Sequence, residues 1–197
     1  MQPAQIRQQY RQLRSSLSLD EQQRHALLLS DNINRYIGFS HKLKIAGYLA
    51  GRGEISLNPW MASCVTAEIY LPMLYELIEP RLRFGRLDQS TRWKSNRFHI
   101  IEPDTSWKNT LHARQLDIVL LPLVAFDIQG NRMGMGGGFY DRTLAFRRGR
   151  RHWLKPRIIG VAHSCQQHPG LPRQPWDVAL DAIITERGII LPGNQPA

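Results

Sequence analysis

Residues 117–144 read DIVLLPLVAFDIQGNRMGMGGGFYDRTL, and this stretch decides the fold because it joins three kinds of local structure. Its apolar run, residues 117–127, is continuous rather than alternating, which is typical of a strand covered on both faces. A loop with five glycines within residues 130–142 follows, and then a segment compatible with a helix. This order predicts an α/β protein whose ligand site lies beyond the carboxyl end of a strand.

Further apolar runs rich in Ile, Val and Leu lie on both sides of this stretch and predict the other strands. They are residues 44–50, 68–74, 81–87, 157–163 and 181–186. Helical stretches are expected between some of them, at residues 58–66 and about 140–148. The pattern predicts an α/β sandwich with a largely parallel sheet.

Two helices are predicted before the first strand. Residues 4–16 carry apolar side chains at helical spacing, and three arginines recur at i, i+4 and i+7 on one stripe: Arg7, Arg11 and Arg14. A second helix should begin after Ser18, where Glu21 completes a capping box, and run to about Tyr36. No Gly/Ser or Pro linker follows, so we expect one domain, residues 1–197, with the helical segment 4–37 packed on it.

Composition and charge restrict the class of protein. The 197 residues are 42% hydrophobic and 21% charged, which is typical of a globular protein. We expect a cytoplasmic protein without a membrane segment, since no signal-peptide pattern or run of about 18 uncharged residues is present. Cys64 and Cys165 lack metal-site spacing, so reduced buried thiols are expected. The net charge of +10 favours an anionic ligand, whether nucleic acid, anionic lipid or a phosphate-bearing small molecule.

The glycine loop has two interpretations. Gly134, Gly136, Gly137 and Gly138 could let main-chain N–H groups approach an anion at the start of the helix, or they could form only a tight turn. The loop is neither a P-loop nor GxGxxG. Asp141 in the first helical turn suits a divalent cation placed between carboxylate and phosphate, or it simply complements the helix dipole.

The stretch LPLVAFDIQGNRMGMGGGFYDRTL closely resembles the signature of the 5-formyltetrahydrofolate cyclo-ligase family. Supporting similarities are the basic pair Arg7 and Arg11, the Glu of GRGEISL, IIEP at 100–103, SW at 106–107 and WDVALDAIITE at 176–186. The resemblance implies a three-layer α/β/α Rossmann-like fold. It also implies ATP-dependent cyclisation of 5-formyltetrahydrofolate to 5,10-methenyltetrahydrofolate with release of ADP and phosphate, and a requirement for Mg²⁺.

The resemblance assigns the nucleotide end of the site. Arg7 and Arg11 match positions that bind ATP phosphates. The loop from Arg132 to Tyr140 matches the segment that wraps the triphosphate and touches the formyl group, with Arg132 and Tyr140 as the catalytic residues. Its other members are Gly134, Met135, Gly136, Gly137, Gly138 and Phe139. Met135 and Gly137 replace basic residues of relatives, so charge stabilisation falls more on main-chain amides, Arg132 and the N-terminal arginines.

The resemblance also assigns the folate and metal positions. Glu54, with Leu49 nearby, matches the folate contact, where a carboxylate can accept hydrogen bonds from the pterin. Trp107 matches an aromatic residue that packs on folate, together with Phe139 and Tyr140 from the loop. Asp141 and Asp177 match the Mg²⁺ ligands, although Trp176 replaces the polar residue that precedes the second Asp in relatives.

The implied chemistry explains this set of residues. The γ-phosphoryl group of ATP is transferred to the formyl oxygen, and N10 then attacks the resulting iminium phosphate. Phosphoryl transfer needs positioning and charge neutralisation rather than a protein nucleophile. We expect a monomer that acts on a small molecule. The alternative from another class is an RNA-binding protein, suggested by the charge and by the basic cluster FRRGRRHW at 146–153.

Overall fold

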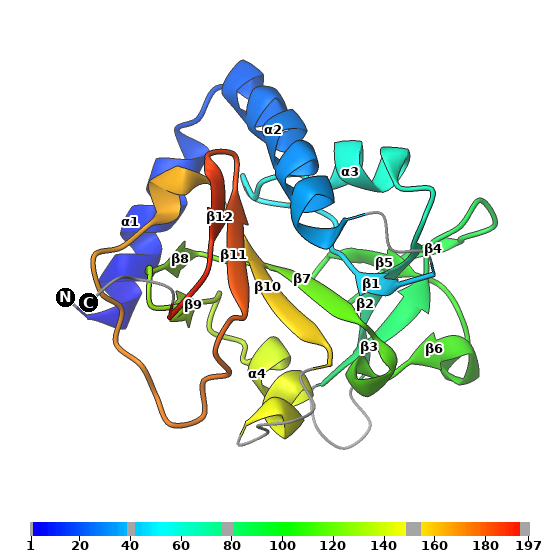
Figure 1. Ribbon diagram of the computed structural model, residues 1–197. Coiled ribbons are helices and arrows are strands. Elements are labelled where there is room, and N and C mark those ends of the chain that lie inside the picture. The colour runs from blue at the N-terminus through cyan, green and yellow to red at the C-terminus, as the bar shows by residue number, and fades with distance from the viewer. Residues whose placement is uncertain (1, 39–41, 76–80, 149–154, 194–197) are drawn as a thin grey trace.

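The computed structural model describes residues 2–38, 42–75, 81–148 and 155–193 (Figure 1). Its α-helices are α1 Pro3–Ser15, α2 Leu19–Ile37, α3 Asn58–Ser63 and α4 Phe139–Leu144. Its strands are β1 Lys44–Ala46, β2 Glu68–Tyr75, β3 Arg81–Arg86, β4 Trp93–Ser95, β5 Ile101–Pro103, β6 Thr110–Leu111, β7 Ile118–Pro122, β8 Ala125–Phe126, β9 Arg132–Met133, β10 Arg157–Val161, β11 Ala182–Thr185 and β12 Gly188–Ile190.

A single large sheet organises the fold, with eight strands in the order β12-β11-β10-β7-β1-β2-β3-β6. The central strands β11, β10, β7, β1 and β2 are parallel, and Ile45 of β1 pairs with Ile69 of β2 and Ile118 of β7. Antiparallel strands lie at both sides: β12 at one edge, and β3 followed by the two-residue β6 at the other. The largely parallel sheet predicted from the sequence is confirmed.

Both faces of the sheet are buried, which is why its strands are continuously apolar. On one face Leu120 and Ile159 pack with α2 and α3 through Leu29, Ile33 and Trp60. On the other face, the neighbouring residues of the same strands join a second core that includes Leu144 of α4: Val119, Leu121 and Ile158. Figure 1 shows α2 and α3 on one side of the sheet and α4 on the other, in agreement with a three-layer sandwich.

Helix α1 packs at the end of the sheet rather than on a face. Ile6 and Tyr10 are buried against Val124, Ala125 and Met133, which belong to or border the small β8–β9 hairpin. The Tyr10 hydroxyl also donates a hydrogen bond to the Gln167 carbonyl at 3.1 Å. This contact places one face of α1 beside the segments that follow β7 and β10.

The predicted strand 117–127 is interrupted, which corrects one sequence expectation. Strand β7 ends at Pro122, and β8 pairs with β9 in a separate two-stranded sheet. Side chains satisfy the main-chain carbonyls at the break, since Gln166 Nε2 donates to Leu123 O at 2.6 Å and to Val124 O at 3.0 Å. The first predicted strand is also shorter, because the chain leaves the sheet after Ala46, and helix α3 ends at Ser63 rather than at residue 66.

The basic cluster 146–153 is not a uniform surface patch. Residues 149–154 lie outside the described residues, but Arg147 is only 9% exposed and Arg148 is exposed. The Nη2 atom of Arg147 donates to both carboxylate oxygens of Asp181, each at 2.9 Å. Asp181 also accepts a hydrogen bond from the Ile158 N–H at 2.6 Å. Arg147 therefore joins the 3-10 turn after α4 to β10 and β11 and has a structural role.

We expect Asp181→Asn to lower the free energy of unfolding by about 2 kcal/mol, because it removes the negative charge that contacts the nearly buried Arg147 guanidinium. Chemical denaturation of the variant measures the loss. The control is Asp31→Asn, which changes an exposed Asp on α2 and should alter stability by less than about 0.5 kcal/mol. Equal stability of the two variants would contradict a structural role for the Arg147–Asp181 pair.

Candidate active site

The strand order reverses direction between β1 and β7, which are neighbours at the centre of the sheet. From β1 the chain continues to β2 on one side, and from β7 it continues to β10 and β11 on the other. Parallel sheets bind ligands beyond the carboxyl ends of the strands at such a point, because the two connections diverge and leave a crevice. The segments that leave β1 and β7 carry Glu54 and the glycine loop, respectively.

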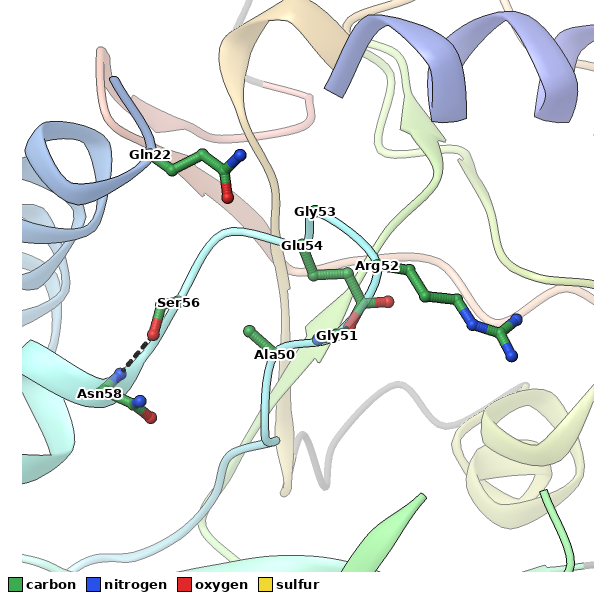
Figure 2. Close-up of a pocket in the computed structure, with 8 residues that line it drawn as sticks. All are labelled: Gln22, Ala50, Gly51, Arg52, Gly53, Glu54, Ser56 and Asn58. Atoms are coloured by element: carbon green, nitrogen blue, oxygen red, sulfur yellow. Dashed lines mark hydrogen bonds between the residues drawn. The ribbon is translucent and has the colours of Figure 1, made fainter. Parts of the chain in front are cut away.

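The segment after β1 forms a tight turn that presents Glu54. Arg52 and Gly53 have positive φ angles of 53° and 75°, and the Glu54 N–H donates to Gly51 O at 3.0 Å. The Gly51 N–H donates to Glu54 Oε2 at 3.2 Å, so the carboxylate folds back over its own turn. This turn lines a cavity of about 230 Å³ together with Gln22 of α2, Ser56 and Asn58. Figure 2 shows how these side chains lie around it.

A buried arginine lies beneath this turn. Arg14 of α1 has no exposed surface, and its guanidinium donates to Arg52 O at 3.1 Å and Leu123 O at 3.3 Å. Its Nη1 lies 3.9 Å from Glu54 Oε1. Arg14, the last of the three arginines predicted on one face of α1, is therefore buried. It supports the Glu54 turn instead of facing solvent. Sequence spacing alone gave no signal of this burial.

Burial controls the electrostatics of Glu54 and Tyr140. Desolvation raises the pKa of Glu54, while the Gly51 N–H and the Arg14 and Arg52 charges oppose this rise. Desolvation together with the nearby Glu54 carboxylate raises the pKa of the Tyr140 phenol. Tyr140 therefore keeps its proton at neutral pH and remains a hydrogen-bond donor near a carboxylate.

The glycine loop lies against the other end of α1. Arg7 Nε donates to the Gly134 carbonyl at 2.9 Å, and residues Gly134 to Gly137 are exposed. Gly138 caps α4 with a left-handed φ of 64°, a conformation that strains other residues. Arg7 thus reaches the loop directly, whereas Arg11 is exposed on the same helix. The exposed main chain of the loop is available to a ligand.

Arg132 organises the acidic residues near this loop. Its guanidinium donates to Asp141 and to the Val178 carbonyl, and its side chain is only 6% exposed. Burial lowers the pKa of Arg132, while the charges of Asp141 and Asp177 raise it. Asp177 also accepts a hydrogen bond from the Gln174 N–H at 2.8 Å. The charges of the two predicted metal ligands thus both act on the buried Arg132 of β9, and Asp141 at the start of α4 contacts it directly.

An apolar hairpin beside the loop was not predicted. The turn between β4 and β5 carries Phe98 and Ile100, which are 42% and 53% exposed, and Ile101 beyond them is 49% exposed. Phe98 meets Phe139 edge-to-face with ring centroids 5.9 Å apart. The run FHII in the sequence is a weak signal for this surface, because only the folded hairpin brings it to the glycine loop.

The remaining predicted site residues are more dispersed. Trp107 packs edge-to-face on Tyr75 at 5.0 Å between centroids, with Lys94 5.7 Å above its ring. It precedes β6, which is three strands from β1 in the sheet. Leu49 is half-buried in the segment after β1, and Met135 is 44% exposed at the tip of the glycine loop. The free cysteines are half-buried rather than buried.

Comparison with known proteins identifies relatives along almost the whole chain. Residues 2–186 match the model of the 5-formyltetrahydrofolate cyclo-ligase family. The Haemophilus influenzae 5-formyltetrahydrofolate cyclo-ligase is 37% identical, with 91% of this chain and 95% of that protein covered. The Escherichia coli K12 cyclo-ligase is 34% identical, with 89% and 95% covered. The NMR structure of Aquifex aeolicus 5,10-methenyltetrahydrofolate synthetase superposes with a TM-score of 0.79 at 27% identity, covering 100% of this chain and 96% of that one.

We expect Arg14→Leu to lower the free energy of unfolding by about 3 kcal/mol, because it removes the buried cation that lies 3.9 Å from the partly buried Glu54 carboxylate. The loss should grow as pH rises through the raised pKa of Glu54, since protonated Glu54 needs no partner. Denaturation at several pH values measures both effects. The matched control is Arg11→Leu on the exposed side of α1, and a double variant with Glu54→Leu should recover part of the loss. A loss of stability that does not change with pH would contradict the coupling between Arg14 and the Glu54 carboxylate.

Proposed function

The chain belongs to the 5-formyltetrahydrofolate cyclo-ligase family, and we propose that the segments following β1 and β7 form the active site of this enzyme. The reaction closes 5-formyltetrahydrofolate to 5,10-methenyltetrahydrofolate and converts ATP to ADP and phosphate. One observation supports the proposal most: the Glu54 turn and the glycine loop follow the two neighbouring strands at which the strand order reverses, and helix α1 contacts both through Arg14 and Arg7.

The turn at Glu54 suits the pterin end of the substrate. A pterin offers an amino group and a ring N–H on one edge, and a carboxylate accepts both as charge-assisted hydrogen bonds. Arg14 and the Gly51 N–H favour the ionised form of Glu54 against the opposing effect of burial. The aromatic side chains of Phe98 and Phe139 supply flat apolar surface for the rings of folate next to the glycine loop.

The glycine loop suits the triphosphate. Exposed main-chain groups from Gly134 to Gly137, with Arg7 and Arg11 from α1, can neutralise phosphate oxygens. Arg132 is held by Asp141 and by the Val178 carbonyl, so its charge is positioned before the substrate arrives. The charges of Glu54 and Arg132 both act on protonated Tyr140, which can donate a hydrogen bond to the oxygen that receives the phosphoryl group. N10 then displaces phosphate and closes the ring.

Mg²⁺ is the metal that we propose for this site. The donor set fits, because Asp141 and Asp177 both lie near Arg132 at the base of the glycine loop, and Mg²⁺ prefers carboxylate together with phosphate oxygens. When bound, Mg²⁺ would neutralise charge on the β- and γ-phosphates. Asp141 would then exchange part of its contact with Arg132 for the cation, which leaves the guanidinium available to phosphate oxygens.

The same proposal covers location and partners. Within the described part of the chain, no helix is long and apolar enough to cross a membrane. We place the reaction in the cytoplasm, where ATP is supplied, and propose that the enzyme works as a monomer because both halves of the site come from one chain. The RNA-binding alternative has no support from the relatives found.

The direct test mixes the purified protein with 5-formyltetrahydrofolate, ATP and Mg²⁺ and follows the absorbance of the methenyl product. We expect turnover that requires all three components. Absence of the methenyl chromophore at saturating substrate would overturn the proposed function. Replacement of ATP by a non-hydrolysable analogue is the control, because it preserves binding and removes phosphoryl transfer.

Glu54→Gln should raise the KM for folate roughly 10- to 100-fold, because it removes charge-assisted hydrogen bonds worth about 1.5–3 kcal/mol. The KM for ATP should change little. Wild-type affinity for folate should fall as pH drops through the raised pKa of Glu54, and this acid limb should be absent in the variant. Parallel kinetics with Glu68→Gln on β2, whose carboxylate accepts from Tyr70 at 2.8 Å, provides the matched control.

Asp141→Asn and Asp177→Asn should each raise the Mg²⁺ concentration needed for half-maximal activity by about tenfold, because each removes one anionic ligand. A Mg²⁺ titration of initial rates measures the shift, and Asp31→Asn on α2 is the control. Unchanged titrations for both variants would remove these residues as metal ligands.

A further inference from the structure

A second group of metal-ligating side chains lies outside the active site, at the carboxyl ends of β10 and β11. It consists of His25 on α2, His163 after β10 and Glu186 after β11, each offering one ligand atom within 4.8 Å of the others. His163 has no exposed surface, Glu186 is 8% exposed, and His25 is half-buried. We propose that these three side chains form a binding site for a transition-metal dication, with Zn²⁺ as the best match.

The packing of α2 brings these residues together. Asn32 Nδ2 donates to the Thr185 carbonyl at 2.9 Å and to the Glu186 carbonyl at 3.3 Å, which holds α2 over the end of β11. His25 precedes Asn32 by two helical turns and therefore lies on the same face of α2. The side chains thus converge from three elements, a geometry that surface residues on a single loop do not provide.

The donor chemistry matches a soft-to-borderline cation. Two imidazole nitrogens and one carboxylate are a set that Zn²⁺ uses when three protein ligands leave one position open. Nδ1 of His25 and Nδ1 of His163 are 2.9 Å apart, so the two nitrogens already face one another.

Groups around the ligands orient them. The Ser164 N–H donates to Glu186 Oε2 at 2.9 Å, and the Ser164 hydroxyl donates to Oε1. His163 lies beside the Gly53 backbone, and its Nε2 is buried without a hydrogen-bond partner among the described residues. Outer contacts such as those from Ser164 to Glu186 set the direction of metal ligands.

The surrounding charges limit the affinity. Arg187 Nε lies 3.9 Å from Glu186 Oε1, and Arg14 also acts on the His163 ring, so two cations face the group. We therefore expect micromolar rather than nanomolar binding of Zn²⁺. Because Gly53 directly precedes Glu54, a bound cation would link α2, β10 and β11 to the turn that carries this carboxylate.

The test is a titration of chelator-treated protein with Zn²⁺ against a chromophoric competitor near neutral pH. We expect one Zn²⁺ per wild-type chain and at least a roughly tenfold weaker affinity in His25→Ala, His163→Ala and Glu186→Gln. The matched control is His99→Asn, which alters an exposed imidazole while Asn tolerates the local φ of 57°. The proposal is overturned if the wild type does not bind Zn²⁺, or if the three variants bind Zn²⁺ as tightly as the wild type does.

A second readout separates this site from other ligands and from loss of folding. Zn²⁺ should raise the Tm of the wild type but not that of His25→Ala, whose half-buried position on α2 tolerates truncation. Excess Mg²⁺ should not displace Zn²⁺. Cys165→Ser should bind like the wild type, and loss of binding in that variant alone would assign Zn²⁺ to the thiol and overturn the proposal. None of these outcomes depends on folate turnover.

Discussion

The burial of the Arg14 guanidinium is the constraint on which both halves of the active site depend. A cation without solvent exposure needs hydrogen-bond acceptors and a nearby anion, and these come from Arg52, Leu123 and Glu54. The first and third lie on the turn after β1, and the second lies where β7 ends. Helix α1 is therefore held against the carboxyl ends of both central strands, and Arg7 reaches the glycine loop from the same helix.

The sheet makes this arrangement rigid because it is packed on both faces. Neighbouring residues of β7, such as Leu120 and Val119, belong to opposite cores, so a shift of the strand by one position would exchange side chains between two close-packed cores. The turns beyond the strands are free to carry polar and strained residues. The left-handed φ of Arg52 and the capping of α4 by Gly138 both occur there, at the proposed contacts with folate and phosphate.

Local signals were sufficient for much of the fold. The capping box of Ser18 and Glu21 marked the start of α2, and the continuous apolar run marked β7, because both features depend on neighbouring residues. The burial of Arg14 was not predictable, since its acceptors are 38 and 109 residues away. The same limit applies to His25 and His163, separated by 138 residues, and to Phe98, whose partner Phe139 begins α4 after the glycine loop. The site residues came from motif resemblance, whereas their supporting contacts required the tertiary structure.

The antiparallel edges of the sheet have a consequence for its behaviour in concentrated solution. Strand β6 comprises two residues and β12 comprises three, whereas the longer strands β7 and β10 are enclosed by neighbours. An edge of two or three residues offers few unpaired main-chain groups to another chain. Sheet extension from one molecule to the next therefore gains little, and the strongly apolar central strands are kept away from the kind of contact that initiates aggregation.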